Sequence, residues 1–102
     1  MQLVRVALDV PVSTLFDYRL DHATRDLIGA RVLVPFGRGQ RAGIILEVGG
    51  ESEVPLERIK PVAHVFEREH RIAPDVLRLM RFASRYYHHP IGQVVMGAQM
   101  LE

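Results

Sequence analysis

The chain has 102 residues, of which 48% are hydrophobic and 25% charged, and its formal net charge is +1. These values fit a single folded domain with a modest core, and they exclude a disordered or fibrous chain. The absence of cysteine excludes a disulfide framework, a thiol nucleophile and a cysteine-rich zinc site. The sequence has neither a bilayer-spanning apolar run nor the features of a signal peptide, so we expect a cytoplasmic protein without membrane contacts.

The first part of the chain has the alternating pattern of short β-strands. Residues 3–9 and residues 14–20, "TLFDYRL", both alternate apolar and polar side chains, which predicts two half-buried strands. The apolar face of the first strand is expected to hold Val4, Val6 and Leu8, and its polar face Arg5 and Asp9. The apolar face of the second is expected to hold Phe16, Tyr18 and Leu20. Asp17 should therefore point away from its aromatic neighbours, on the same face as Arg19.

A β-hairpin is predicted next. Residues 31–37 and 42–48 alternate as well, and the segment between them, "GRGQR", contains turn-forming glycines. The inward side chains are expected to be Val32, Val34, Phe36, Ile44, Leu46 and Val48. A phosphate-binding loop is a weaker interpretation, because such a loop precedes a helix and here a strand follows. Residues 57–66 are expected to add a strand at an edge or bulge, since Pro61 cannot donate a ladder hydrogen bond.

The pattern changes to a helical period after about residue 70. Pro74 and Asp75 suit a first helical turn, and the helix is expected to run to His89, just before Pro90. Its inward face is expected to hold Val76, Leu79, Met80, Ala83 and Tyr87. The opposite side carries a basic stripe of Arg78, Arg81 and Arg85.

Residues 91–100 predict a second, shorter helix, which Gly92 and Gly97 should weaken. The fold class is therefore predicted to be α+β, as one domain. It should have a small antiparallel sheet or partial barrel over about residues 2–67 and a helical segment over about residues 73–99. We interpret residues 101–102, "LE", as a cloning remnant.

Charges are segregated along the chain. Residues 47–57 contain four glutamates and no base, whereas residues 31–41 contain three arginines and no acid. All cations are arginine except Lys60, and the planar guanidinium suits phosphate contacts. The candidate phosphate contacts are Arg38, Arg41, Arg78, Arg81 and Arg85. A general bias toward arginine and a solvated helix face explain the same residues, so these alternatives stay open.

No pattern typical of an enzyme is present. Lys60 does not follow a glycine, as the lysine of a phosphate loop does, so the chain has no such ATPase motif. The three serines lie outside nucleophile-elbow patterns: Ser13, Ser52 and Ser84. His88 and His89 are adjacent, so their side chains diverge rather than converge on a metal. We therefore expect no catalytic residues, no metal and no cofactor in this chain.

Five motifs occur together in order: "FDY" (16–18), "RVLVPFG" (31–37), "AGII" (42–45), "IKPV" (59–62) and "YYHHPIGQVV" (86–95). As a set they resemble the N-terminal domain of the PriA family of bacterial replication restart helicases, over about residues 3–98. The resemblance implies an excised domain that binds the 3′ end of the nascent leading strand at a stalled replication fork. It also implies that sites for ATP, magnesium and zinc belong to the remainder of such proteins.

The same resemblance implies several partners. These are DNA, the remainder of the helicase, and other primosome and single-strand-binding proteins. A protein-interaction module that docks onto the helicase body or another primosome protein remains the alternative function. Under either interpretation the chain itself performs no reaction.

The resemblance places the end-binding pocket of the family on Phe16, Asp17, Tyr18, Gly37 and Lys60. A 3′ terminus carries a hydroxyl, which donates a hydrogen bond, whereas a phosphodiester offers only acceptors. The carboxylate of Asp17 would accept from this hydroxyl and repel a phosphate. Gly37 would let the backbone approach a base or sugar, and Lys60 would reach a phosphate or a base acceptor.

From the residues alone, simpler interpretations of this pocket stay open. Asp17 would then pair with Arg19 or another surface arginine, Gly37 would serve only the turn, and Lys60 would be a solvated strand residue. In the acidic segment at residues 47–57 we expect no agreement with the family in length or charge, and this puts no residue of the expected pocket in doubt. Base identity is expected to matter little to binding.

Overall fold

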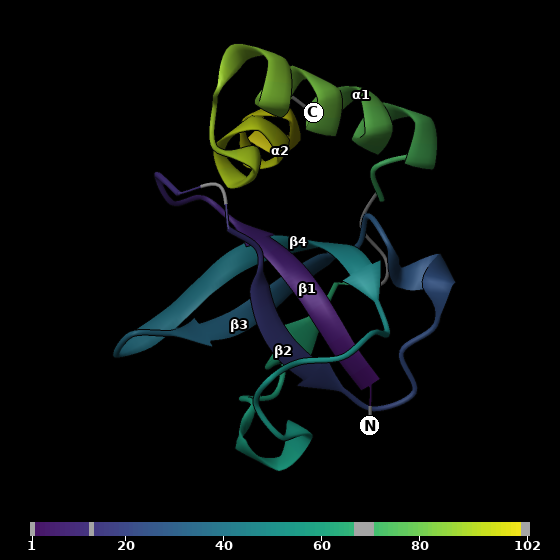
Figure 1. The fold of residues 1–102 in the computed structure, drawn as a ribbon, viewed down its shortest axis with the longest axis vertical. Coiled ribbons are helices and arrows are strands. Elements are labelled where there is room, and N and C mark those ends of the chain that lie inside the picture. The colour runs from purple at the N-terminus through teal and green to yellow at the C-terminus, as the bar shows by residue number, and fades with distance from the viewer. Residues whose placement is uncertain (1, 13, 67–70, 101–102) are drawn as a thin grey trace.

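The computed structural model describes residues 2–12, 14–66 and 71–100. In this part of the chain five strands form one antiparallel sheet in the order β2-β1-β4-β3-β5, and two helices cover one side of it (Figure 1). The elements are β1 (Gln2–Leu8), β2 (Phe16–Leu20), β3 (Arg31–Phe36), β4 (Gly39–Val48), β5 (His64–Val65), α1 (Pro74–Tyr87) and α2 (Ile91–Met100). The predicted α+β class, with a sheet followed by helices, is confirmed. Ser13 and the interpretation of residues 101–102 lie outside the described residues.

The sheet curls into a partial barrel because residues 60–66 contact strands toward both ends of the strand order, β2 and β3. The amide of Arg19 in β2 donates to the carbonyl of Lys60 at 3.1 Å. The amide of Ala63, three residues later, donates to the carbonyl of Leu33 in β3 at 2.8 Å. Pro61 lies in the bridge to β2, where its missing amide removes no bond of a continuous ladder. The strand expected over residues 57–66 is thus only two residues long.

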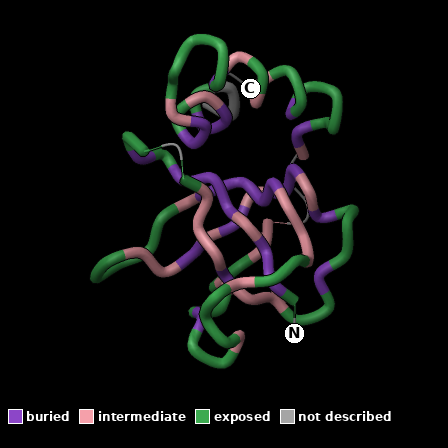
Figure 2. Tube along the Cα trace, viewed as in Figure 1, coloured by how far each residue is buried: buried purple, intermediate pink, exposed green. Residues whose placement is uncertain are grey.

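The core has two parts, one on each side of the sheet. The barrel side is filled by side chains that include Val4, Val6, Leu8, Tyr18, Val32, Val34 and Ile45. The helix side is filled by Ala7, Ile44, Leu46, Ile72, Leu77, Ile91, Val95 and Met96. Figure 2 shows the buried positions concentrated along the central strands and on the side of the helices that faces them. β1 and β4 lie inside the sheet and contribute side chains to both parts of the core.

β4 contains a β-bulge at Leu46, which has no partner in β1. Its neighbours Ile45 and Glu47 lie opposite consecutive residues of β1. Leu46 packs on the helix side, whereas Val48 packs on the barrel side. The expected common face for Leu46 and Val48 is therefore wrong, because one extra residue reverses the alternation beyond it. The bulge also leaves Glu47 on the helix side of the sheet.

α1 presents a different face to the sheet than its periodicity predicts. Its buried residues are Leu77 and Ser84, and Met80 packs partly buried beside them. The large apolar side chains left exposed are Val76, Leu79, Phe82, Tyr86 and Tyr87. The inward assignment of Val76, Leu79 and Tyr87 is therefore wrong. Apolar residues occur on more than one side of this helix, so its period alone does not determine which face packs on the sheet. Just before α1, Ile72 is buried and its amide donates to the carbonyl of Gly29 at 3.1 Å.

α2 forms as predicted and packs against β1 and β4. A Cβ added at Gly92 would lie 1.4 Å from the carbonyl oxygen of Leu8 in β1. The glycine expected to weaken this helix is therefore what allows it to approach the sheet. Neither described helix has the length and apolar character needed to cross a membrane.

Candidate functional site

A cavity of about 340 Å³ lies at the β2 edge of the sheet, and we call it the edge cavity. Three segments distant in the sequence form its walls: β2, the β3–β4 turn and residues 52–60. Together they bring into one cavity all the residues of the expected pocket, namely Phe16, Asp17, Tyr18, Gly37 and Lys60. The structure adds six lining residues to this set, namely Pro35, Phe36, Ser52, Val54, Arg58 and Ile59. Two of these, Ser52 and Val54, belong to the acidic segment at residues 47–57, where none of the expected pocket residues lies.

The aromatic residues of β2 hold this strand against the β3–β4 hairpin. Tyr18 is only 5% exposed, and its hydroxyl donates to the carbonyl of Pro35 at 2.7 Å. Burial raises the pKa of the Tyr18 phenol above its ordinary value, so it stays a neutral donor. The rings of Phe16 and Phe36 meet edge to face with centroids 5.5 Å apart. The prediction that these aromatics pack in the core is confirmed, and they also line the cavity.

Gly37 begins the turn between β3 and β4. Its φ of 59° and its place as the first of two turn residues are typical of a type II′ hairpin, which favours glycine there. A Cβ at Gly37 would meet nothing within 4 Å, so the space beside it is open. Lys60 lies on the other side of the cavity with an exposed side chain, held there by the hydrogen bond of its carbonyl with Arg19.

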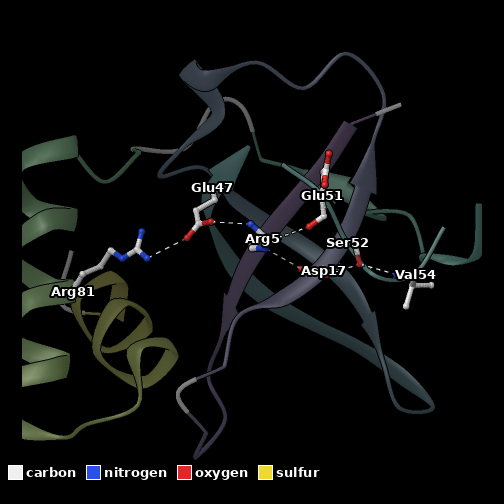
Figure 3. A network of polar contacts seen from close by, with 7 residues as sticks. All are labelled: Arg5, Asp17, Glu47, Glu51, Ser52, Val54 and Arg81. Carbon is white, nitrogen blue, oxygen red and sulfur yellow. Dashed lines mark hydrogen bonds and ion pairs between the residues drawn. The ribbon is translucent and has the colours of Figure 1, made fainter. Parts of the chain in front are cut away.

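Asp17 points away from its aromatic neighbours, as the alternation predicts. Its Oδ1 lies 3.3 Å from Nε of Arg5, the residue opposite it on β1. Its Oδ2 accepts a hydrogen bond from the hydroxyl of Ser52 at 3.0 Å (Figure 3). The simpler interpretation from the sequence, that Asp17 pairs with Arg19 or another surface arginine, therefore holds with Arg5 as the arginine. Arg19 donates its Nε–H to the carbonyl of Ile59 at 2.7 Å. Asp17 is thus an ion-paired carboxylate at the wall of a cavity.

The ion pair of Asp17 belongs to a row of alternating charges that we call the charged row: Asp17, Arg5, Glu47 and Arg81. Glu47 accepts from Arg5 at 3.1 Å and from Arg81 of α1 at 3.2 Å (Figure 3). Partial burial alone would raise the pKa of Glu47, but the hydrogen bonds and charges of the two arginines outweigh it, so the pKa is lowered. The charged row connects the edge cavity to the first helix.

The three arginines of the α1 stripe differ in their surroundings. Arg78 pairs with Asp75 on the same helix, and Arg81 pairs with Glu47. Arg85 forms no ion pair with the residues that the structure describes. It lines a second cavity of about 420 Å³ between α1 and the sheet, which we call the helix cavity and to which Arg81 and His88 also contribute.

The two candidate arginines of the hairpin lie near the edge cavity. Arg38 is the exposed second residue of the β3–β4 turn, directly after Gly37. Arg41 stacks over the ring of Phe36, with its guanidinium carbon 5.3 Å from the ring centroid, and donates to the carbonyl of Asp9 at 3.2 Å. Of the two, Arg38 is the more available to a ligand. Within the described ranges no three His, Asp or Glu side chains are arranged to hold a metal.

The fold defines a small α+β domain, with a cavity at the edge of its sheet that both polar and apolar side chains line. The sequence model of a PriA domain family, described as "3′DNA-binding domain (3′BD)", matches residues 5–99 of the chain. The chain belongs to this family, as the motifs in its sequence predicted.

Replication restart proteins from several bacteria are similar to the chain. It is 35% identical over 98 residues to "Replication restart protein PriA" of Haemophilus influenzae, covering 96% of this chain and 13% of that protein. It is 30% identical over 96 residues to the protein of the same name from Rickettsia conorii, covering 92% and 14%. The protein of this name from Treponema pallidum is 28% identical over 98 residues, covering 90% and 15%. The chain therefore spans only a small part of the length of these relatives.

Proposed function

We propose that the domain binds the 3′-hydroxyl end of a DNA strand in the edge cavity. This binding has little base specificity and contributes to replication restart. One observation carries the proposal. Phe16, Asp17, Tyr18, Gly37 and Lys60 come from three distant segments, yet they line one cavity. Membership of the 3′ DNA-binding domain family supports the same ligand.

Asp17 supplies the selectivity in this proposal. An ionised carboxylate offers about four acceptor positions, and the contacts with Arg5 and Ser52 use only part of this capacity. A 3′-hydroxyl at the cavity donates to a remaining position through a charge-assisted bond. A 3′-phosphate brings negative charge and acceptor oxygens to the same place, so it is repelled.

The other residues of the edge cavity bind features that all nucleotides share. The open space beside Gly37 admits a sugar or base close to the backbone. The aromatic pair of Phe16 and Phe36 presents an apolar surface that does not depend on base identity. Lys60 and Arg38, both exposed at the cavity or its turn, attract the nearest phosphates.

Fluorescence anisotropy with single-stranded oligonucleotides tests the proposal. The wild-type domain should bind a strand ending in 3′-OH more tightly than the identical strand ending in 3′-phosphate. Asp17→Ala should reduce this preference by about tenfold or more, because a hydrogen bond to a charged group is lost. Asp9→Ala, which removes an exposed carboxylate outside the cavity, is the matched control and should retain the preference.

Circular dichroism should show that Asp17→Ala remains folded, since a partly exposed position outside the core usually costs little stability. Equal affinity of the wild-type domain for the two strand ends would disprove the proposal. An unfolded Asp17→Ala variant would assign a structural role to the carboxylate instead.

A second function, docking onto another protein, is favoured by the exposed apolar face of α1. This face comprises Val76, Leu79, Phe82, Tyr86 and Tyr87, with exposed fractions of 43–67%. The rings of Phe82 and Tyr86 stack with centroids 5.7 Å apart, so part of the face is continuous. A continuous apolar patch is typical of a protein-binding surface. The remainder of a longer restart protein is the partner that we propose for it.

Calorimetry tests this docking directly. The chain should bind the Haemophilus influenzae relative from which the matching segment has been removed. A Leu79→Ser, Phe82→Ser double variant should lose that binding and keep its preference for a 3′-hydroxyl. Absence of heat with the wild-type chain would remove docking from consideration.

A further inference from the structure

We propose that Ser52 and Arg5 are positioning residues of the edge cavity. They fix the orientation of the Asp17 carboxylate, and so set how strongly the domain discriminates a 3′-hydroxyl from a 3′-phosphate. The inference rests on the proposed function and deepens it. It assigns the acidic segment at residues 47–57 to the selectivity of the site.

The hydroxyl of Ser52 has contacts on both sides. Its oxygen accepts a hydrogen bond from the amide of Val54 at 3.2 Å, and its proton is donated to Oδ2 of Asp17 at 3.0 Å. The direction of the second bond follows from chemistry, because an ionised carboxylate only accepts. A backbone amide therefore orients Ser52, and Ser52 orients one oxygen of Asp17 (Figure 3).

The guanidinium of Arg5 orients the other oxygen. Its Nε lies 3.3 Å from Oδ1 of Asp17. One terminal nitrogen donates to Glu47 at 3.1 Å, and the other donates to the carbonyl of Glu51 at 2.8 Å. Three acceptors on three segments hold a planar group in one orientation.

Positioning matters here because the carboxylate is only partly buried. The side chain of Asp17 is 33% exposed, and the terminal torsion of an aspartate has a broad energy minimum. Without Ser52 the carboxylate would rotate, and its free acceptor positions would no longer face the strand end consistently. The expected consequence is a loss of discrimination, with a smaller change in overall affinity.

The acidic segment reaches Asp17 through contacts of its backbone. The amide of Gly49 donates to the carbonyl of Leu3 at 2.7 Å, so the segment turns back over the N-terminal end of β1. The bond between Arg5 and the carbonyl of Glu51 then holds it beside β2. Ser52, the next residue, is thereby delivered to the edge cavity.

The ratio of dissociation constants for 3′-phosphate and 3′-OH oligonucleotides tests the inference. Ser52→Ala should lower this ratio roughly three- to tenfold, the usual effect of one hydrogen bond. Ser52→Thr, which keeps the hydroxyl, should restore it. Thr14→Ala removes a hydroxyl from an exposed residue outside the cavity, and should leave the ratio unchanged. Arg5→Lys keeps the charge but lacks the planar fork, so it should lower the ratio as well.

The outcomes separate the two levels of the proposal. A wild-type domain without any preference would refute the proposed function itself. A wild-type preference that Asp17→Ala removes but Ser52→Ala leaves intact would refute only the positioning role. Weaker binding of both oligonucleotides by the same factor, with a lower melting temperature, would show that Ser52 is structural and would also overturn the inference.

Discussion

The edge cavity and the helix cavity differ in size and in chemistry, and the difference shows which property identifies a site. The helix cavity is the larger, at about 420 Å³ against about 340 Å³, and its polar groups are mainly Arg81, Arg85 and His88 from the end of one helix. The edge cavity combines a carboxylate, an ammonium group and an open glycine turn from three segments. Cations suit any phosphate along a strand, whereas recognition of a terminus requires an acceptor for its hydroxyl. Chemistry rather than volume is therefore the reason why we propose the edge cavity as the site.

The charged row joins the two cavities without merging them. Asp17 lies at the edge cavity and Arg81 at the helix cavity, with Arg5 and Glu47 between them. If the cavities have separate functions, changes at one should leave the behaviour of the other intact. Arg85→Ala examines this independence directly, and two further variants test the contacts that form the helix cavity and the charged row.

The largest effect is expected from Gly92→Ala, which disturbs the helix cavity. The new methyl group would meet the carbonyl of Leu8, so α2 must move from β1 and take the adjacent Ile91 from the cavity wall. We expect a loss of about 3 kcal/mol in the free energy of unfolding, measured by urea denaturation. Gly97→Ala is the matched control, because its Cβ would meet nothing, and it should be neutral or stabilising. Equal effects of the two substitutions would contradict the close approach of α2.

Arg85→Ala should have an intermediate effect, on DNA affinity alone. If this arginine contacts one phosphate, the slope of log affinity against log salt for single strands should become shallower by about 0.7. The preference for a 3′-hydroxyl should not change, because Arg85 lies outside the edge cavity. Arg25→Ala, at an exposed position outside both cavities, should leave the slope unchanged. An unaltered slope for Arg85→Ala would separate the helix cavity from DNA binding.

The smallest effect is expected from Glu47→Gln, which breaks the centre of the charged row. The lowered pKa means that the folded state favours the ionised form, so this carboxylate stabilises the fold above its unfolded pKa. Because the side chain is 37% exposed, solvent screening limits the loss at pH 7 to about 0.5 kcal/mol.

The pH dependence of that loss is the sharper measurement. As pH falls through the folded pKa of Glu47, the wild-type domain loses the same charge, so the stabilities of wild type and variant should converge. Urea denaturation at several pH values follows this convergence. A difference that stays constant into acid would mean that the ion pairs of Glu47 do not cause it.

The sequence predicted the residues of the edge cavity better than their contacts. The orientation of Asp17 opposite to Phe16 and Tyr18 follows from the two-residue period of a strand. Its partner Arg5 is adjacent only because β1 pairs with β2 in one particular register. Ser52 was missed because a single serine in an acidic segment carries no local signal, and only the return of residues 49–52 over β1 brings it to Asp17.

The sequence by itself determined the types of elements, their order, the face of β2 that carries Asp17, and the family motifs. The tertiary structure alone decided the rotation of α1, the side of the sheet on which Glu47 lies, and the partners of Asp17. The physical reason is that a hydrophobic period defines faces within an element but not how that element meets its neighbours. Long-range contacts supply this information. The bulge at Leu46 places Glu47 on the helix side of the sheet, and the hydrogen bond of Ile72 with Gly29 holds the chain just before α1.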